Sequence, residues 1–110
     1  MPSRVGSRRQ FALLAKPTAK GHSGPLRVSF VASTSDDAPV SVAYAISRQV
    51  GNAVVRNRIR RRLRALFDDL DPQPAPGIYL VKCGYETGRL PYAELQQHLH
   101  EALVRANVIV

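Results

Sequence analysis

Residues 45–66 have the sequence A-I-S-R-Q-V-G-N-A-V-V-R-N-R-I-R-R-R-L-R-A-L, and this stretch decides the fold. It starts as the end of a strand, is interrupted at Gly51, and continues as a helix that Asn52 can cap. We expect this helix to span residues 53–67. At about 100° per residue, its apolar side chains fall within about 120° of one another and must face a sheet. They are Val55, Ile59, Leu63, Leu66, Phe67 and Leu70.

The rest of the helix surface is basic. Six arginines lie between positions 56 and 64, without an acid three or four residues away until Asp68. Like charges at this spacing cost a few tenths of a kcal/mol each, and a bound polyanion relieves that cost. A solvated charged face is the usual explanation of such a run, but it explains neither the missing acids nor the preference for Arg over Lys. The pattern therefore favours nucleic-acid binding through Asn57, Arg58, Arg60, Arg61, Arg62 and Arg64.

Two details of this helix leave alternatives open. Arg56 falls at the edge of the apolar stripe. Its side chain either extends past the rim of the sheet, or the loop before the helix also contacts nucleic acid. Asp68, Asp69 and Asp71 crowd the end of the helix. They either pair with the preceding arginines or form a metal-binding cluster, although no nearby Glu or His supports a metal.

Charge is distributed unevenly along the 110 residues. Sixteen Lys and Arg against eight Asp and Glu give a net charge of +8. Residues 1–35 contain basic side chains and no acid, whereas acids outnumber bases after residue 67. The earlier part of the chain therefore has the potential to bind polyanions. It includes an arm, residues 1–10, that we expect to be flexible and whose basic residues are Arg4, Arg8 and Arg9. Nucleic acid is the leading partner class, and an anionic membrane surface is the second.

Composition excludes several other classes of protein. The length suits one domain over residues 1–110, and no apolar run is long enough for a bilayer span or a signal peptide. A lone cysteine, Cys83, cannot form an internal disulfide, which fits the cytoplasm. The histidines, His22, His98 and His100, do not cluster in the sequence. We therefore expect no catalytic residue and no metal ligand in the protein itself.

The remaining periodicity predicts an α+β two-layer sandwich in the order helix–strands–helix–strand–helix. A short helix at residues 10–15 precedes a loop at residues 18–25. Alternating strands at residues 26–33 and 40–47 flank a polar turn and suggest an antiparallel pair. The apolar run at residues 78–83 suits a central strand. A last helix is expected at residues 92–106.

Residues 45–66 closely resemble the signature of the bacterial ribonuclease P protein component. The matching features are the strand, Gly51, Asn-Ala-Val, and then Arg56-Asn57-Arg58 with further basic residues. Agreement elsewhere is looser. Arg4-Val5 followed by Phe11 looks like the family's N-terminal pattern, and Y-A-E-L at residues 92–95 looks like the start of its last helix. The resemblance implies a left-handed crossover around the central helix.

The resemblance also implies a function. The protein would be the accessory subunit of an endoribonuclease whose RNA subunit, with Mg²⁺, removes the 5′ leader of precursor tRNA. The central helix, together with Arg48 and Asn52, would dock on that RNA subunit. A cleft between the sheet and the first helix would hold the leader, and no further protein partner is implied. The leader contacts would come from Phe11, Phe30, Leu14 and Tyr44.

Two of these predicted leader contacts are less specific than the others. For Tyr44, core packing is an equally good interpretation. Leu14 is included because Ala15 stands where the family usually has a second aromatic side chain. This departure implies a weaker grip on the leader.

Two other functions remain as alternatives. One is a small structural protein of the ribosome or another RNA scaffold. The other is a transcription factor with the basic helix in a DNA major groove, which requires a preceding helix where this sequence has a strand.

We expect the double substitution Arg56→Ala and Arg58→Ala to weaken binding to the RNA subunit and to reduce the dependence of affinity on salt. Each phosphate contact contributes about one unit to the slope of log K against log salt. Titrations at several salt concentrations measure that slope. An unchanged slope would rule out a phosphate contact by these two side chains.

Overall fold

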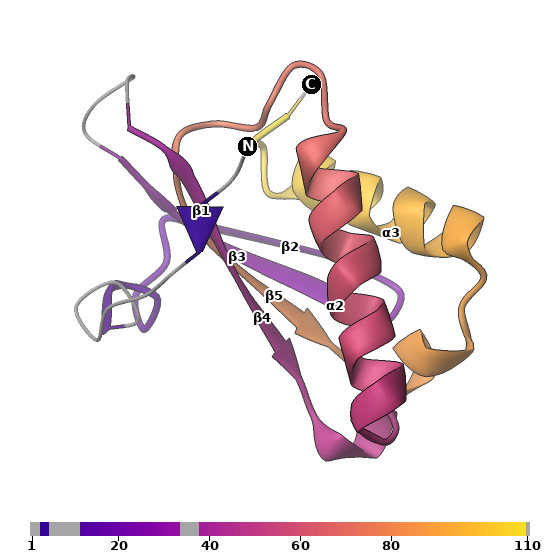
Figure 1. The fold of residues 1–110 in the computed structure, drawn as a ribbon. Helices are drawn as coiled ribbons and strands as arrows, with labels where there is room; N and C mark the ends of the chain where they lie inside the picture. Colours follow the sequence, from indigo (N-terminus) through magenta and orange to yellow (C-terminus); the bar gives the residue numbers. More distant parts are fainter. Residues whose placement is uncertain (1–2, 5–11, 34–37, 110) are drawn as a thin grey trace.

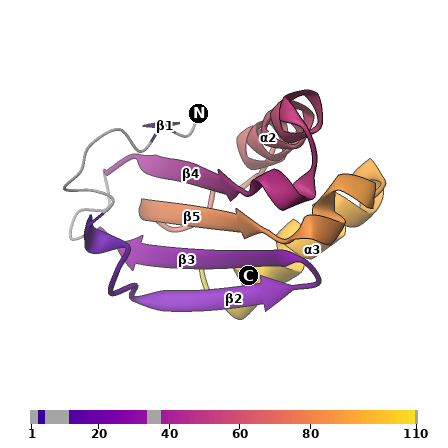
Figure 2. The same ribbon diagram turned by 90° about the horizontal axis from the view of Figure 1, so that it is seen from below.

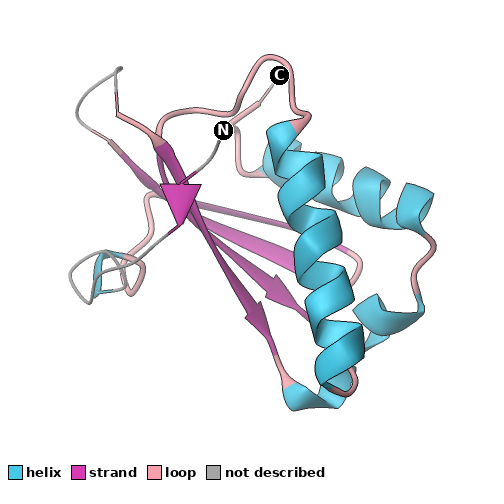
Figure 3. Cartoon of the chain, in the orientation of Figure 1, coloured by secondary structure: helices cyan, strands magenta, loops and turns pink. Residues whose placement is uncertain are grey.

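A single mixed sheet carries two long helices on one face (Figure 1). The structure, a computed structural model, describes residues 3–4, 12–33 and 38–109. Its elements are β1 (Ser3–Arg4), β2 (Ala19–Ser23), β3 (Leu26–Ala32), β4 (Val40–Ile46), η1 (Arg48–Val50), α2 (Ala53–Asp68), β5 (Gly77–Cys83), η2 (Tyr85–Arg89) and α3 (Tyr92–Arg105). The expected two-layer α+β class is confirmed (Figure 3).

β5 is the centre of the sheet, whose order is β1-β4-β5-β3-β2. β3 pairs with it antiparallel and β4 pairs with it parallel, as Figure 2 shows. The prediction that the apolar run before Cys83 is a central strand is therefore confirmed. Because β4 and β5 are parallel neighbours, the chain must cross from one end of the sheet to the other between them, and α2 makes that crossing. The left hand of this crossover stays a prediction from the resemblance.

The expected antiparallel pairing of residues 26–33 with residues 40–47 is wrong. Both segments are strands, but β5 lies between them and pairs with each. Alternation of polar and apolar residues indicates a strand and its buried face, but it does not predict which strand pairs with it. A short polar connection suggested a hairpin, whereas β5 pairs with β3 along one edge and with β4 along the other and so separates them.

The loop expected at residues 18–25 is also wrong, because Ala19–Ser23 is the edge strand β2. The two glycines that suggested a loop have other structural roles. Gly24 has φ +55 in the turn that joins β2 to β3. Gly21 lies directly under α3, where a Cβ atom would come 2.1 Å from the Ala102 carbonyl oxygen. Here glycine marks a hairpin and a close helix contact rather than a missing strand.

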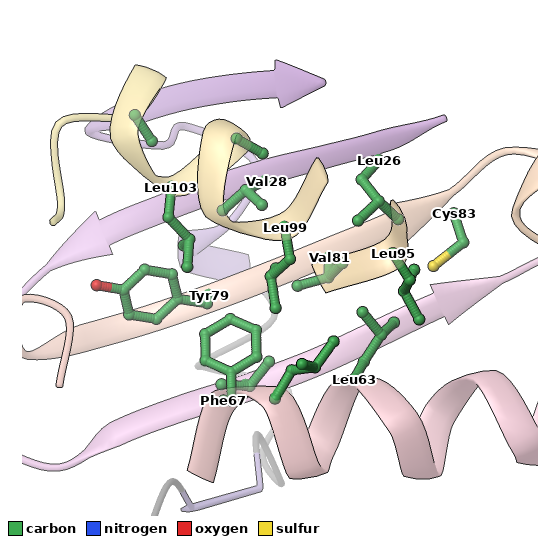
Figure 4. Close-up of a cluster of buried hydrophobic side chains, with 14 of the residues drawn as sticks. Leu26, Val28, Leu63, Phe67, Tyr79, Val81, Cys83, Leu95, Leu99 and Leu103 are labelled. Carbon is green, nitrogen blue, oxygen red and sulfur yellow. The ribbon is translucent and has the colours of Figure 1, made fainter. Parts of the chain in front are cut away.

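The core fills the space between the sheet and the helices (Figure 4). Three rings join the two layers: the Phe30 and Tyr79 centroids are 4.7 Å apart, and those of Phe67 and Tyr79 are 6.0 Å apart. The Tyr79 hydroxyl donates a hydrogen bond to the Ala75 carbonyl, so the polar end of this buried ring is satisfied. The stripe predicted for the central helix is confirmed, with Ile59, Leu63, Leu66 and Phe67 buried and Val55 and Leu70 partly buried.

We expect Gly21→Ala to lower the free energy of unfolding by about 1–3 kcal/mol, because its new methyl group must push α3 away from β2. The matched control is Gly84→Ala, where the nearest atom would be 3.3 Å away. Urea denaturation of both variants measures the difference. Equal stability of the two variants would contradict the tight packing at Gly21.

Candidate nucleic-acid interface

The start of α2 is fixed by a side-chain cap. Asn52 Oδ1 accepts a hydrogen bond from the backbone N–H of Val55 at 3.0 Å, which confirms Asn52 as the N-cap. The first turn of the helix contains no acid. Its positive end therefore adds to the arginine charges instead of being neutralised. η1 and β4 precede α2, so the helix pair that a helix-turn-helix requires is not present at this point.

The arginines of α2 lie on two sides of the helix. Arg56, Arg60 and Arg64 follow one another at intervals of four residues along one side of α2, where Arg64 lies near Tyr44 of β4. Arg64 acts on Tyr44 there: burial raises the pKa of the Tyr44 hydroxyl, and the charge of Arg64 opposes that rise. Arg58 and Arg62, also four residues apart, lie on the side towards α3. An open hollow of about 460 Å³ adjoins the first row and is lined by Val54, Asn57, Arg60, Arg61 and Arg64.

Three of these arginines, Arg58, Arg61 and Arg64, are exposed, and Arg56, Arg60 and Arg62 are half-buried. The contacts they make with described residues are a hydrogen bond from Arg60 Nη1 to Asn57 Oδ1 (2.8 Å) and the Arg62 guanidinium above the Tyr92 ring (6.0 Å). No acid in the described part of the chain forms a salt bridge with them. Arg56 is half-buried, and its Nε is buried without a hydrogen-bond partner. This position fits a side chain that extends along the rim of the sheet.

The acids that end α2 do not neutralise this surface. Asp68 Oδ1 is buried without a hydrogen-bond partner, so it is not paired with an arginine of the preceding turn. Within residues 3–4, 12–33 and 38–109, no three His, Cys, Asp or Glu side chains lie close enough together to hold a metal ion. The described residues therefore offer no ligand cluster of this kind to a metal ion.

Two of the expected leader contacts lie in the core. Phe30 is 6 % exposed and packs on Tyr79, so its ring is not available to stack on a nucleotide. Tyr44 packs edge-on against Phe67, with the ring centroids 6.3 Å apart, which is the core role that its sequence left open. Both rings face the helices. The alternation of apolar and polar residues indicated that these strands have a buried face. It could not predict that the helices cover the face on which Phe30 and Tyr44 lie.

The other predicted contacts are near or beyond the limits of the described chain. Leu14 is buried in a turn that follows the helical residues Ala12 and Leu13. Arg4 belongs to β1 and pairs with Val42 of β4. Phe11, Arg8 and Arg9 lie outside the described residues. Arg48 is exposed in η1, immediately before α2.

The uncovered face of the sheet carries basic residues that the sequence analysis missed. The strand register places His22, Arg27 and Lys82 side by side across β2, β3 and β5, and Lys20 lies in the next row opposite Ser29. All four side chains are exposed, unlike their neighbours along each strand. They border a hollow of about 380 Å³. Because residues 18–25 were expected to be a loop, the sequence analysis did not place Lys20 and His22 on a sheet face. Their alternation with less exposed neighbours is the pattern that could have indicated the strand.

One cluster resembles a catalytic triad in composition but not in geometry. Ser23 Oγ donates to Glu101 Oε2 at 2.7 Å and lies 2.8 Å from His98 Nδ1. The single hydroxyl proton is thus directed at the carboxylate, and the histidine must donate to the same oxygen rather than accept its proton. Ser23 is only 3 % exposed. These contacts tie the β2–β3 hairpin to α3 and offer no nucleophile.

The sequence profile described as Ribonuclease P matches residues 2–107 of this chain. The chain belongs to the ribonuclease P protein family. A relative from Clavibacter michiganensis, named ribonuclease P protein component, is 35% identical over 107 residues, which cover 94% of this chain and 92% of the relative. A second, from Shouchella clausii, is 31% identical over 109 residues, covering 96% and 87%.

Solved structures of RNase P proteins share the fold. A mutant of the Staphylococcus aureus protein superposes with a TM-score of 0.85 at 21% identity, covering 96% of this chain and 89% of that one. The Thermotoga maritima protein gives 0.77 at 19% identity, covering 98% and 99%. These likenesses extend over nearly the whole family domain. In the described residues, no helix has the length and apolar character needed to cross a membrane.

We expect Ser23→Ala to lower the melting temperature at neutral pH and the difference from the wild-type protein to shrink in acid. The hydrogen bond from Ser23 lowers the pKa of the Glu101 carboxyl. Its stabilising contribution is therefore present above the unfolded pKa of that group and is lost as pH falls through the folded pKa. Thermal unfolding at a series of pH values measures this. A constant difference at every pH would mean that the Glu101 hydrogen bond is not the stabilising contact.

Proposed function

We propose that this chain is the protein subunit of ribonuclease P, which binds the RNA subunit through α2 and assists removal of the 5′ leader from precursor tRNA. The observation that carries the proposal is the arginine face of α2, which the described acids leave unpaired. Its apolar stripe holds the helix rigidly on the sheet, so the charges are presented in a fixed array. A rigid array of guanidinium groups can bind phosphates at a lower entropy cost than flexible side chains can.

In this proposal the RNA subunit, with the Mg²⁺ it binds, carries out the cleavage, and the reaction takes place in the cytoplasm. Metal ions supply the electrostatic stabilisation that phosphodiester cleavage requires. The protein's residues neutralise phosphate repulsion between the RNA subunit and its substrate. Less Mg²⁺ is then needed to hold the two RNAs together.

The uncovered face of the sheet is the better candidate for the leader than the rings of Phe30 and Tyr44. It combines exposed cations with the half-buried apolar side chains Val31, Ile78 and Leu80 in adjacent rows. A single strand is commonly bound by such a pairing of charged groups for phosphates with apolar or aromatic groups for bases. Phe11 stays a predicted contributor to this site.

Reconstitution tests the function directly. The purified chain is mixed with the cognate RNA subunit at low Mg²⁺, and release of the 5′ leader is followed. We expect a clear rate enhancement over the RNA subunit alone. RNA binding without enhancement would instead support the role of an RNA-scaffold protein.

We expect the double substitution Arg27→Gln and Lys82→Gln to weaken binding of precursor tRNA while binding of mature tRNA is unchanged. These two cations lie opposite each other on the uncovered face and would contact only the leader. Affinity for both RNAs is measured with the reconstituted holoenzyme, so mature tRNA is the internal control. An equal loss for both RNAs would place the substituted residues elsewhere than at the leader.

A further inference from the structure

Two tyrosines on the helix-bearing side of the molecule are exposed without an evident structural reason. Tyr85 opens η2 and is 59 % exposed, and Tyr92 opens α3 and is 41 % exposed. Tyr85 belongs to the connection between β5 and α3, which Figure 1 shows in orange beside α2, and Tyr92 begins α3 directly after it. Each exposes a large ring to water, which a purely structural connection does not require.

This connection is held firmly against α2. At Gly88 of η2, a Cβ atom would lie 2.7 Å from the Val50 carbonyl oxygen and 3.5 Å from Val55, so η2 contacts both η1 and the first turn of α2. The Thr87 hydroxyl donates to the Gly84 carbonyl at 2.7 Å and closes the turn. The tyrosines therefore extend from an ordered base.

An arginine of α2 reaches one of these rings, that of Tyr92. Val55, Arg58 and Arg62 follow at i, i+3 and i+7, so they lie along one side of α2. At one end of this line Val55 faces η2, and at the other end the Arg62 guanidinium lies 6.0 Å above the Tyr92 ring. Arg58 is exposed between them.

Charge over this region is net positive. Arg48 of η1 and Arg89 of η2 join Arg58 and Arg62, whereas Glu86 and Glu94 are the acids of η2 and the first turn of α3. We call Arg58, Arg62, Tyr85, Arg89 and Tyr92 the tyrosine–arginine surface. It belongs to the helix layer, whereas Arg27 and Lys82 lie on the uncovered face of the sheet (Figure 2). A single-stranded segment of a few nucleotides cannot contact the tyrosine–arginine surface and the uncovered face of the sheet at the same time.

We propose that the tyrosine–arginine surface binds unpaired nucleotides of the RNA subunit, with Tyr85 and Tyr92 stacking on bases and the arginines contacting phosphates. The proposal rests on the proposed function and adds a second type of contact to it. Exposed rings beside guanidinium groups are the chemistry that recognises unstacked bases, because every base has a face on which a ring can stack. A duplex would offer its phosphates to the arginines but no base face to the tyrosines.

Fluorescence tests the stacking directly, since the sequence contains no tryptophan. Tyr85→Trp and Tyr92→Trp each introduce a single indole on the surface, and Val104→Trp places one at the far end of α3, where Val104 is 41 % exposed. We expect saturating RNA subunit to quench the indole strongly at positions 85 and 92 and to leave position 104 nearly unchanged. Unchanged emission at positions 85 and 92, under conditions where the RNA is bound, would overturn the proposal.

Affinity gives a second readout. We expect Tyr92→Ala and Tyr85→Ala each to weaken binding of the RNA subunit by about tenfold, with an unchanged salt slope because no cation is removed. Tyr92→Phe retains the ring and should restore affinity. Wild-type affinity in both alanine variants would exclude stacking. If the wild-type chain does not bind the RNA subunit, the proposed function is wrong. If it binds, but the tyrosine substitutions change neither affinity nor indole emission, only this inference is wrong.

Discussion

The contact between the apolar stripe of α2 and the strand β5 is the constraint on which the rest of the structure depends. Phe67 reaches Tyr79 of β5, and Tyr79 reaches Phe30 of β3, so three rings connect the crossover helix to the middle of the sheet. Burying such rings contributes several kcal/mol each, a large fraction of the stability of a small domain. This contact sets the rotation of α2 about its axis, and with it the direction of every arginine.

That rotation gives the helix two functional edges rather than one basic face. The side with Arg56, Arg60 and Arg64 brings Arg64 near Tyr44 of β4, whereas the side with Arg58 and Arg62 brings Arg62 over Tyr92 of α3. An RNA that wraps around α2 can therefore meet different surroundings on each side. On the first side it meets the rim of the sheet, and on the second it meets exposed tyrosines. In the proposed function, this separation would let one helix hold a large RNA in a single orientation.

Much of the fold could be predicted from local pattern. The extent of α2, its Asn52 cap, its buried stripe and the central position of β5 all follow from periodicity and capping chemistry. Strand pairing could not be predicted in the same way. β3 and β4 are close in sequence but are separated by β5, which the chain reaches only after α2. Residues 18–25 concealed a strand because Gly21 accommodates α3, a contact made with residues about eighty positions later.

The sequence by itself determined the chemistry of the site: a helix with one apolar side, arginines over the rest, and no acid before Asp68. These features depend on residues within a few turns of each other, where helical geometry is fixed. Tertiary structure decided which side chains are available. It buried Phe30 against Tyr79, packed Tyr44 against Phe67 of α2, aligned Arg27 with Lys82 on the uncovered face, and brought Tyr92 beneath Arg62. Those outcomes depend on which strands pair and on which face the helices cover, and both are set by long-range packing.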